Sequence, residues 1–445
     1  MARILSDQYQ SVFTTPQYGP RKLQELSKFK LSNILFTPKD VIEAFEAISI
    51  SSAPGPDGVF PIVLRDYAEE LAHPFYLIWR RSMDTGENPD VTHVAHVTAI
   101  FKSGDKSDAA NYRPVSLTNH ITKAFEKIIK NEIVFHLTKH QLYNESQHGF
   151  RKSRSTQTNL IEYYESILHQ LDSNTTVDSI YLDFSKAFDK CDHGIILDKL
   201  EALGISGKLL NWIADFLRNR KQIVVVQGFK SEAIWVVSGV PQGSVLGPLL
   251  FLILMYDITE GITHSILSSF ADDTKMWKGI NNSTSKLMLQ NDLNNIYDWA
   301  LQNNMAFNNK KFQAIRFHSL FTSLDLGKYT DPAGIDIEFH NHVKDLGIFI
   351  SEDLSFDEHI RYITAKGKQM AGWILRVFDS RSPFLMKILL KQLIIPRIEY
   401  GCVLWSPTSL DQIKHLESVQ KFYEEKDISF FILGESYTIC SLVFN

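Results

Sequence analysis

Two adjacent aspartates, Asp272 and Asp273, stand between two strand-like runs in "HSILSSFADDTKMWKG", residues 264–279. Such runs on both sides of a short polar turn predict an antiparallel β-hairpin, and this hairpin commits the surrounding sheet to antiparallel pairing. Taken alone, the acidic pair is typical of an ordinary turn, because Asp side chains bond nearby backbone groups. Two neighbouring carboxylates also repel each other, however, and a divalent cation relieves that repulsion.

A third carboxylate, Asp183, ends another apolar strand pattern in "SIYLDF", residues 179–184. If this strand lies beside the hairpin, three carboxylates meet at one end of a sheet; otherwise Asp183 is an ordinary strand-end cap. Such a cluster of oxygen ligands suits Mg²⁺. Two Mg²⁺ ions about 4 Å apart can clamp the attacking and leaving oxygens of an in-line phosphoryl transfer. Paired strands would therefore create a metal-dependent phosphoryl-transfer site.

Strand and helix patterns alternate through most of the remaining chain, without an internal repeat. A helix is predicted from Pro38 with Thr37 as its N-cap, paired strands are predicted within 94–117 and 221–239, and "DLGIFI" has the pattern of one strand. The first 35 or so residues show little periodicity and are predicted to be an arm or linker. Because the central hairpin is antiparallel, we predict an α+β fold and not a doubly wound sheet.

After about residue 355 the pattern is helical. Apolar residues recur every three or four positions from Ile360 to Val377, which predicts a helix with that stripe facing the core. Basic side chains lie off the stripe, so the opposite face is either simply solvated or available to nucleic acid.

Composition excludes several classes of protein. The formal net charge of −5 gives no sign of a polyanion partner, so any nucleic-acid contact must rest on a local basic surface. The widely spaced Cys191, Cys402 and Cys440 argue against a zinc site or disulfide framework and for a reducing compartment. The longest apolar run, "VLGPLLFLILMY", is far shorter than the roughly 20 residues of a membrane span, and the N-terminus lacks a signal peptide's apolar stretch. We expect an intracellular protein with no membrane partner.

Three motifs, in one order, carry a family resemblance. "YLDFSKAFD" (181–189), "GVPQGSVLGPLLFLI" (239–253) and "FADDT" (270–274) resemble the palm motifs of reverse transcriptases, particularly those of jockey-like and related non-LTR retrotransposons. Further similar segments run from "APGPDG" at 53–58 to "LESVQKF" at 416–422, so the resemblance covers roughly residues 38–422. It implies a right-hand polymerase with fingers, a palm of antiparallel sheet backed by helices, and a helical thumb.

The resemblance also implies a layout along the chain. Its parts are an N-terminal arm or linker (1–36), a helical N-terminal extension (37–90), fingers and palm (91–350), a helical thumb and connection (351–425) and a divergent tail (426–445). Because only about 35 residues precede the similar region, we expect the polymerase portion without the endonuclease that such elements usually carry ahead of it.

The resemblance assigns the metal ligands. Asp183 and Asp272 would hold the metal throughout catalysis, with Asp273 as the adjoining acid, and these three aspartates would be the catalytic residues. The carbonyl oxygen of Phe184 would complete the ligand set. The cofactor implied is a pair of Mg²⁺ ions, with Mn²⁺ as an alternative.

The resemblance also implies a nucleotide-binding set, namely Lys102, Arg113, Phe188, Gln242, Gly243 and Lys311. Phe188 falls at the steric gate, where a ring excludes the 2′-OH of an rNTP; by pattern alone it is an ordinary core aromatic. Gln242 would touch the nucleotide, and Gly239 and Gly243 would let backbone approach it, although Pro-Gln-Gly is also an ordinary strand-to-helix turn.

The roles of the basic members of that set have alternative interpretations. Lys102 and Arg113 match the fingers residues that hold the triphosphate, but by themselves they are surface cations. Lys311 matches a proton donor to pyrophosphate, and its neighbour Lys310 fits the same role.

Contacts with nucleic acid rest on two basic segments. Arg151, Lys152 and Arg154 would meet template phosphates, or else form a solvated loop. Lys366 and Lys368, on the basic face of the late helix, would contact the product duplex through phosphates, in a salt-sensitive and weakly sequence-dependent way.

These residues together predict an RNA-directed DNA polymerase that adds dNTPs to a primer 3′-OH on an RNA template by two-metal-ion phosphoryl transfer. Its partners would be the RNA template, a DNA primer and dNTPs, and its place the nucleus if the element is active. One alternative is a non-catalytic relic or truncated fragment acting at most as an RNA-binding module, which the unusual tail favours. Another is an RNA-templated RNA polymerase, which does not predict a bulky Phe188.

Overall fold

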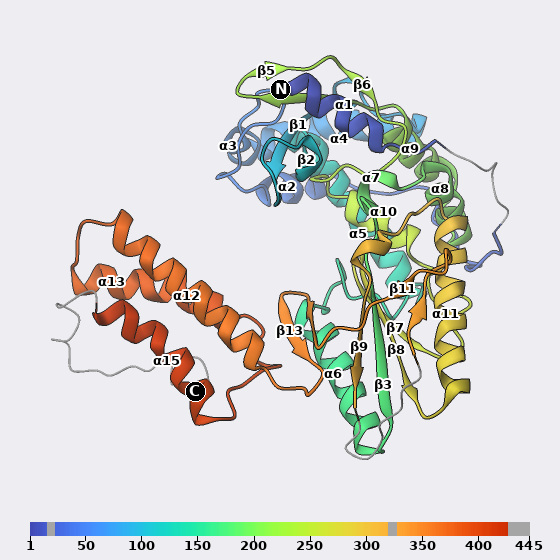
Figure 1. The fold of residues 1–445 in the computed structure, drawn as a ribbon. Helices are drawn as coiled ribbons and strands as arrows, with labels where there is room; N and C mark the ends of the chain where they lie inside the picture. The colour runs from blue at the N-terminus through green and yellow to red at the C-terminus, as the bar shows by residue number, and fades with distance from the viewer. Residues whose placement is uncertain (16–22, 319–326, 426–445) are drawn as a thin grey trace. The chain divides into compact units, whose positions relative to one another are not determined.

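The computed structural model describes residues 1–15, 23–318 and 327–425, so the predicted tail 426–445 lies outside the described residues. The chain forms two compact units (Figure 1). Unit 1 comprises residues 1–150, 183–262 and 294–308. Unit 2 comprises residues 151–182, 263–293 and the chain from 309 onward. Both units are therefore assembled from segments that are far apart in the sequence.

Unit 1 begins with a helix that the sequence pattern did not predict. Where an arm or linker was expected, α1 (Ala2–Val12) buries Leu5 and Tyr9 against Val97 of β1 (Val94–Phe101) and Val224 of β4 (Lys221–Val226). Two large apolar residues four positions apart cover one helix face but are too few to give a convincing period.

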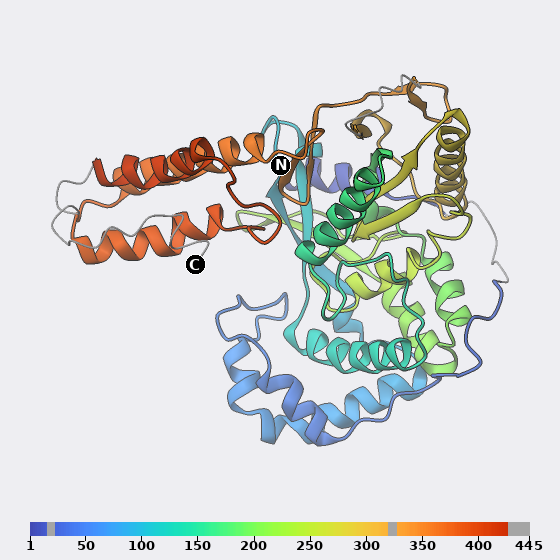
Figure 2. The same ribbon diagram turned by 90° about the horizontal axis from the view of Figure 1, so that it is seen from below.

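The helix predicted from Pro38 is confirmed as α2 (Pro38–Glu46). Its N-terminus is a capping box, in which the Thr37 backbone N–H donates to Asp40 Oδ2 at 2.7 Å. Helix α2 packs against α4 (Ala68–Thr85) and α5 (His120–Lys139), as the blue and cyan helices of Figure 2 show. The other helical elements of unit 1 are α3 (Pro61–Asp66), η1 (Asp90–Thr92), η2 (Ala109–Asn111), α7 (Ala187–Lys190), α8 (His193–Ala202), α9 (Gly207–Arg218) and α10 (Gly247–Leu254).

The sheet of unit 1 is mixed. Strands run in the order β2-β1-β4-β5, where β2 is Tyr112–Leu117 and β5 is Phe229–Lys230, and β6 (Ile234–Trp235) pairs with β4. Strand β1 pairs antiparallel with β2 and parallel with β4. The two predicted strand pairs are thus confirmed, and the one parallel pair between them makes the sheet mixed.

Unit 2 contains the four-stranded antiparallel sheet that the hairpin predicted. Its order is β7-β8-β3-β9, with bounds Ile266–Phe270, Asp273–Ile280, Thr176–Leu182 and Gln313–Phe317. Helix α6 (Thr156–Asp172) packs against β3 and β7 (Figure 1). The charge of the buried Asp178 of β3 is compensated by Arg316, whose Nε donates to Oδ1 at 2.7 Å, and the Tyr329 hydroxyl donates a further hydrogen bond to Oδ2. An α+β fold with mixed sheets is therefore confirmed.

The prediction of one strand over 345–350 is wrong. The segment belongs to a hairpin of β12 (His342–Asp345) and β13 (Ile348–Ser351). Its turn residues Leu346 and Gly347 have φ of +44° and +96°, and two positive φ values are what a type I′ turn needs. The long helix α11 (Ser283–Gln302) begins in unit 2 and ends in unit 1. The short elements of unit 2 are η3 (Asn309–Lys311), β10 (Tyr329–Thr330) and β11 (Asp336–Ile337).

The end of unit 2 is helical, as predicted. Helices α12 (Asp357–Val377) and α15 (Leu410–Glu425) pack side by side (Figures 1 and 2), joined by the short elements α13 (Pro383–Leu389), the π-helix η4 (Leu390–Ile394) and α14 (Ile395–Ile398). Ile360, Ile363 and Ile374 are buried as the apolar stripe predicted, whereas Val377, at the last turn, is 53% exposed. Within the described ranges no helix is long and apolar enough to cross a membrane.

Candidate active site

The acidic pair stands at a two-residue hairpin turn in unit 2, with Asp272 in the turn and Asp273 at the start of β8. Phe270 of β7 pairs with Asp273 of β8, so Ala271 and Asp272 form the turn. Ala271 has φ +57°, the sign that the first turn residue needs in a type II′ hairpin and that residues other than glycine rarely adopt. Asp272 is half-buried and Asp273 is exposed. The turn reading and the functional reading of the pair are thus compatible, because the turn presents the acids.

Buried polar contacts hold the strands beneath this turn. The hydroxyls of Ser269 and Thr274 lie 3.0 Å apart across the hairpin. From α6, the buried Asn159 side-chain amide donates to Ser268 Oγ at 2.7 Å and to the Ser269 carbonyl at 3.3 Å. Because each buried polar group has a partner, the tip is fixed by the sheet and by α6 together.

The strand that leads to Asp183 lies beside the hairpin, which confirms the pairing on which the three-carboxylate prediction depended. Leu182, the last residue of β3, is opposite Thr274 of β8, and Asp183 is the next residue in the chain. Across the described residues no group of three or more His, Cys, Asp or Glu side chains is placed to hold a metal ion. The roles of the three aspartates therefore remain predictions.

The backbone after β3 is anchored within unit 1. The Asp183 carbonyl accepts a hydrogen bond from the Asn308 N–H at 2.8 Å. The next residue, Phe184, is buried and forms a β-bridge with Phe307, and the two rings stack with centroids 4.4 Å apart. The Phe184 carbonyl, predicted as a metal ligand, thus belongs to a rigidly held backbone segment.

The predicted steric gate, Phe188, is held between other rings of unit 1. Its ring stacks on Phe251 of α10 at 4.5 Å and 13°, and Phe150 meets it edge-on at 6.0 Å. Phe251 is fully buried and Phe188 is half-buried, so Phe188 forms the exposed layer of a fixed aromatic stack. A ring that cannot swing away can act as a wall.

Gln242 is fixed from two sides. Its Nε2 donates to Asp189 Oδ1 at 2.7 Å, and its carbonyl accepts from the Ser116 N–H of β2 at 2.7 Å. The next residue, Gly243, has φ +117°, and a Cβ there would lie 2.4 Å from the Ser116 carbonyl oxygen. Only glycine fits where the loop approaches β2 so closely. The backbone geometry therefore explains the glycine at position 243, whether or not it also contacts a nucleotide.

Asp189, which the sequence analysis did not single out, is the electrostatic centre of this part of unit 1. Burial raises its pKa, while the Gln242 hydrogen bond and the charges of Lys186, Arg220 and Arg113 act to lower it. The structure therefore places the Gln242 amide and the Arg113 charge near one carboxyl group, and Phe188 and Gly243 are the chain neighbours of Asp189 and Gln242. Burial raises the pKa of Tyr9 in α1, and the nearby charge of Asp189 raises it further.

The loop before Gln242 is held by two side chains, the half-buried Arg220 and the buried His193. Arg220 and His193 both donate to the Gly239 carbonyl, His193 through Nε2 at 2.8 Å. Burial and the nearby Arg220 lower the pKa of His193 to about 4, so this imidazole is neutral near pH 7 and keeps a single N–H to donate. Gly239 has φ +84° and would place a Cβ 2.6 Å from the Asp189 carbonyl oxygen.

A second missed carboxyl, Glu126 of α5, supports the loop after Gly243. Its Oε2 accepts from the backbone N–H groups of Val245 at 2.8 Å and Leu246 at 2.9 Å. Glu126 is fully buried, and among the described residues its Oε1 has no hydrogen-bond partner. Burial raises the pKa of Glu126 to about 7, although both backbone bonds act to lower it.

This shift predicts a pH-dependent stability. The folded protein keeps the Glu126 proton up to about pH 7, whereas the unfolded chain releases it near 4.5. The free energy of unfolding should therefore fall by about 3 kcal/mol as pH rises across that window. In Glu126→Gln, which keeps an acceptor oxygen but cannot ionise, that fall should disappear. Urea unfolding at pH 5 and pH 8 measures the difference, and an equal fall in both proteins would contradict the assignment.

The other predicted cations lie at the surface or have protein partners. Lys102 is exposed just after β1, Lys152 is exposed, and Arg154 forms an ion pair with Glu162. Lys311 is exposed at the end of η3 in unit 2. Arg151 and Lys368 are half-buried, and Lys366 is exposed on α12.

Comparison with known proteins identifies the family of the chain. A sequence model of the family described as "Reverse transcriptase (RNA-dependent DNA polymerase)" matches residues 102–350. The chain is 26% identical over 399 residues to a probable RNA-directed DNA polymerase from transposon X-element of Drosophila melanogaster, covering 86% of this chain and 43% of that protein. It is also 26% identical over 439 residues to the RNA-directed DNA polymerase from mobile element jockey of the same species, covering 94% and 47%.

A third relative, from transposon BS of Drosophila melanogaster, is 23% identical over 397 residues. The chain spans somewhat less than half the length of these relatives. The matched region contains the hairpin acids, Asp183, the Phe188 stack and the Gln242 loop. The chain therefore belongs to the reverse transcriptase family and is related to the polymerases of jockey-like and X-element non-LTR retrotransposons.

Proposed function

We propose that this chain is an RNA-directed DNA polymerase of a non-LTR retrotransposon, which adds dNTPs to a primer 3′-OH on an RNA template. The observation that carries the proposal is the pairing of β3 with β8, in which Leu182 lies opposite Thr274. That register joins the strand ahead of Asp183 to the strand that begins with Asp273, within the family's matched region.

The right-hand arrangement is part of the proposal. The four-stranded sheet of unit 2 would be the palm floor, the β1–β2 hairpin of unit 1 would belong to the fingers, and helices α12 to α15 would be the thumb. The continuous antiparallel sheet beneath the acidic turn, and the helical content after residue 356, support these assignments.

The donor set fits a hard divalent cation. Asp183 and Asp272 would hold two Mg²⁺ ions, with Asp273 and the Phe184 carbonyl as further oxygen ligands, and Mn²⁺ would be an alternative ion. All four donors are oxygens, and the Phe184 backbone is fixed by its bridge to Phe307. When bound, the metal would stabilise the charge of the pentacoordinate transition state at phosphorus and would lower the pKa of the primer hydroxyl.

The residues of unit 1 would select and orient the incoming nucleotide. The Phe188 ring, backed by Phe251, would stack against the deoxyribose and clash with a 2′-OH. Gln242, held by Asp189, would position the nucleotide at the loop, and Arg113 would neutralise triphosphate charge. Lys311 would donate a proton to the pyrophosphate leaving group. Reverse transcription primed on chromosomal DNA would place the protein in the nucleus.

The proposal is tested by primer extension. The purified chain, incubated with Mg²⁺, dTTP and a poly(rA)/oligo(dT) substrate, should lengthen the primer, and chelation of the metal with EDTA should stop the reaction. Added Mg²⁺ should restore it. No extension with either Mg²⁺ or Mn²⁺, from a folded and monodisperse protein, would reject the proposed activity.

The Asp189–Gln242 bond gives a further prediction. Asp189→Ala removes the acceptor of Gln242 Nε2, so KM for the dNTP should rise roughly 10-fold, because one charge-assisted hydrogen bond is worth about 1.5 kcal/mol. Asp189→Asn keeps an acceptor oxygen and should raise KM less. Steady-state kinetics at varied dTTP separates KM from kcat. A fall in kcat alone, equal in both variants, would show that Asp189 acts elsewhere.

A further inference from the structure

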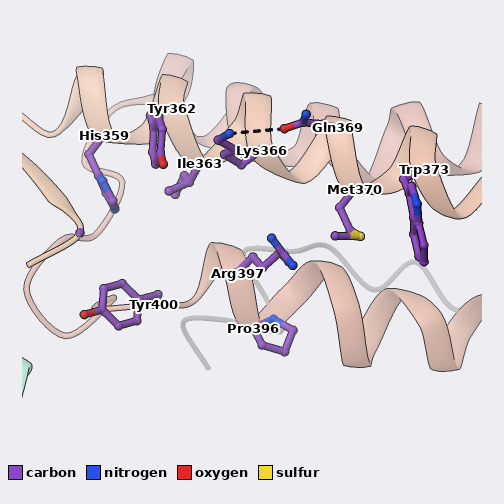
Figure 3. Close-up of a pocket in the computed structure, with 11 residues that line it drawn as sticks. His359, Tyr362, Ile363, Lys366, Gln369, Met370, Trp373, Pro396, Arg397 and Tyr400 are labelled. Atoms are coloured by element: carbon purple, nitrogen blue, oxygen red, sulfur yellow. Dashed lines mark hydrogen bonds between the residues drawn. The ribbon is translucent and has the colours of Figure 1, made fainter. Parts of the chain in front are cut away.

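A groove of about 740 Å³ lies within unit 2, between α12 and the chain around α14 (Figure 3). Tyr362, Lys366 and Trp373 line it from α12, at spacings of four and seven residues that put them on one helix face. Arg397 and Tyr400 line the opposite wall. Figure 3 shows Tyr362, Met370 and Trp373 of α12 directed toward that wall.

The groove presents aromatic rings to solvent. Trp373 is 43% exposed and Tyr400 is 42% exposed, although large aromatic side chains are usually well buried. Both are held in place: the Trp373 ring meets Phe378 edge-on at 6.2 Å, and the Tyr400 hydroxyl donates to the Leu346 carbonyl at 2.8 Å. Fixed, exposed rings of this kind are stacking platforms.

The charges of the groove have one sign. Lys366 and Arg397 line it, and among the described residues its lining includes no Asp or Glu. Lys366 Nζ lies 3.4 Å from Gln369 Oε1, a weak contact with a neutral group that does not compensate the ammonium charge. At one end a further cation, Lys344, donates to the Tyr362 hydroxyl at 3.0 Å. The groove therefore suits an anionic ligand that also offers flat rings.

We infer that this groove binds single-stranded RNA, with bases stacked on Trp373 and Tyr400 and phosphates on Lys366 and Arg397. A duplex would satisfy the two cations but hides its base faces, so it would leave both exposed rings without partners. An acidic peptide would likewise neutralise the two cations but would leave the two exposed rings without stacking partners. The inference rests on the proposed function, which supplies RNA as the template strand.

The test measures binding without catalysis. The chain carrying Asp272→Asn is titrated in EDTA against a fluorescein-labelled 12-nucleotide RNA of mixed sequence, and against the same RNA paired with complementary DNA. Trp373→Ala should weaken binding of the single strand at least about 5-fold, because stacking one base is worth about 1 kcal/mol or more. Binding of the hybrid duplex should stay within about 2-fold. Trp373→Phe keeps a ring and should retain most of the single-strand affinity.

Matched variants outside the groove provide the controls. Trp235→Ala removes a tryptophan of unit 1 that is 56% exposed, and Arg361→Ala removes an exposed arginine from α12 that does not line the groove. Neither should change single-strand affinity as Trp373→Ala does. Arg397→Ala should also reduce the salt slope of log K by about 0.7, the value for one phosphate contact on a single strand, and Arg361→Ala should not.

Each outcome has one reading. Equal losses on single strand and duplex, no loss with Trp373→Ala, or equal losses with Trp235→Ala would overturn the inference. A loss confined to single-stranded DNA of the same sequence would overturn the assignment to RNA, whereas equal losses on both single strands support stacking on the bases. Because this assay needs neither metal nor dNTP, a chain that binds in this way but fails in primer extension would refute the proposed activity alone.

Discussion

Asp272→Asn is expected to reduce primer extension by roughly 10³-fold or more, equivalent to about 4 kcal/mol of lost transition-state stabilisation. The substitution keeps the size of the side chain and removes its charge, so the two-residue turn between Phe270 and Asp273 should still form. Single-turnover extension on poly(rA)/oligo(dT) measures the rate, and thermal melting checks the fold. Asp183→Asn should have an effect of the same order, and Asp273→Asn a smaller one.

A matched acid outside the site distinguishes a ligand from a general surface charge. Asp353 is an exposed aspartate in a turn of unit 2, where it accepts a hydrogen bond from the Ser355 N–H. Asp353→Asn should leave the rate within about 2-fold of the unmodified chain. If Asp272→Asn retained the full rate, the assignment of the hairpin acids would be wrong.

Phe188→Ala is expected to raise the use of rNTPs relative to dNTPs on the order of 10²-fold. The reason is geometric: the Phe188 ring is stacked 4.5 Å from the buried Phe251 and meets Phe150 edge-on, so it cannot move aside for a 2′-OH. Removing the ring removes the clash. The measurement is the ratio of kcat/KM for dTTP and UTP on the same template.

Two variants sharpen that result. Phe188→Tyr keeps the ring and should keep the selection of the sugar. Phe150 is 50% exposed and touches Phe188 only by its edge, so Phe150→Ala should change the ratio far less than Phe188→Ala. An unchanged ratio in Phe188→Ala would remove the gate assignment.

The fold was predictable where local chemistry determines it. The capping box of α2, the hairpin of β7 and β8 and the period of α12 are each encoded within a few neighbouring residues. The misses have physical causes. Helix α1 depends on Leu5 and Tyr9 meeting Val97 and Val224, and the β12–β13 turn depends on a leucine adopting a positive φ. Neither a distant packing partner nor an unfavourable backbone conformation produces a periodic pattern of residues in the sequence.

The site divides in the same way. Motif order predicted roles for Asp183, Phe188 and Gln242, but it did not indicate the groups that hold them. Glu126 meets Val245 across 119 positions and Asp189 meets Gln242 across 53, distances over which no periodicity extends. The one sequence signal for a role of Glu126 was its position on an apolar helix face, because carboxyl groups are rarely buried without a specific partner.

The place of β3 in its sheet has a consequence during synthesis. This buried strand lies between β8 and β9, and β9 ends only at Phe317. A ribosome must therefore complete well over 100 further residues after Leu182 before both edges of β3 are paired. Until then an apolar strand with open backbone groups is exposed, the kind of segment that recruits other chains into aggregates. Copies of such an element shortened by a stop codon before β9 should be insoluble as well as inactive, so their products would be removed from the cell, not retained as inert protein.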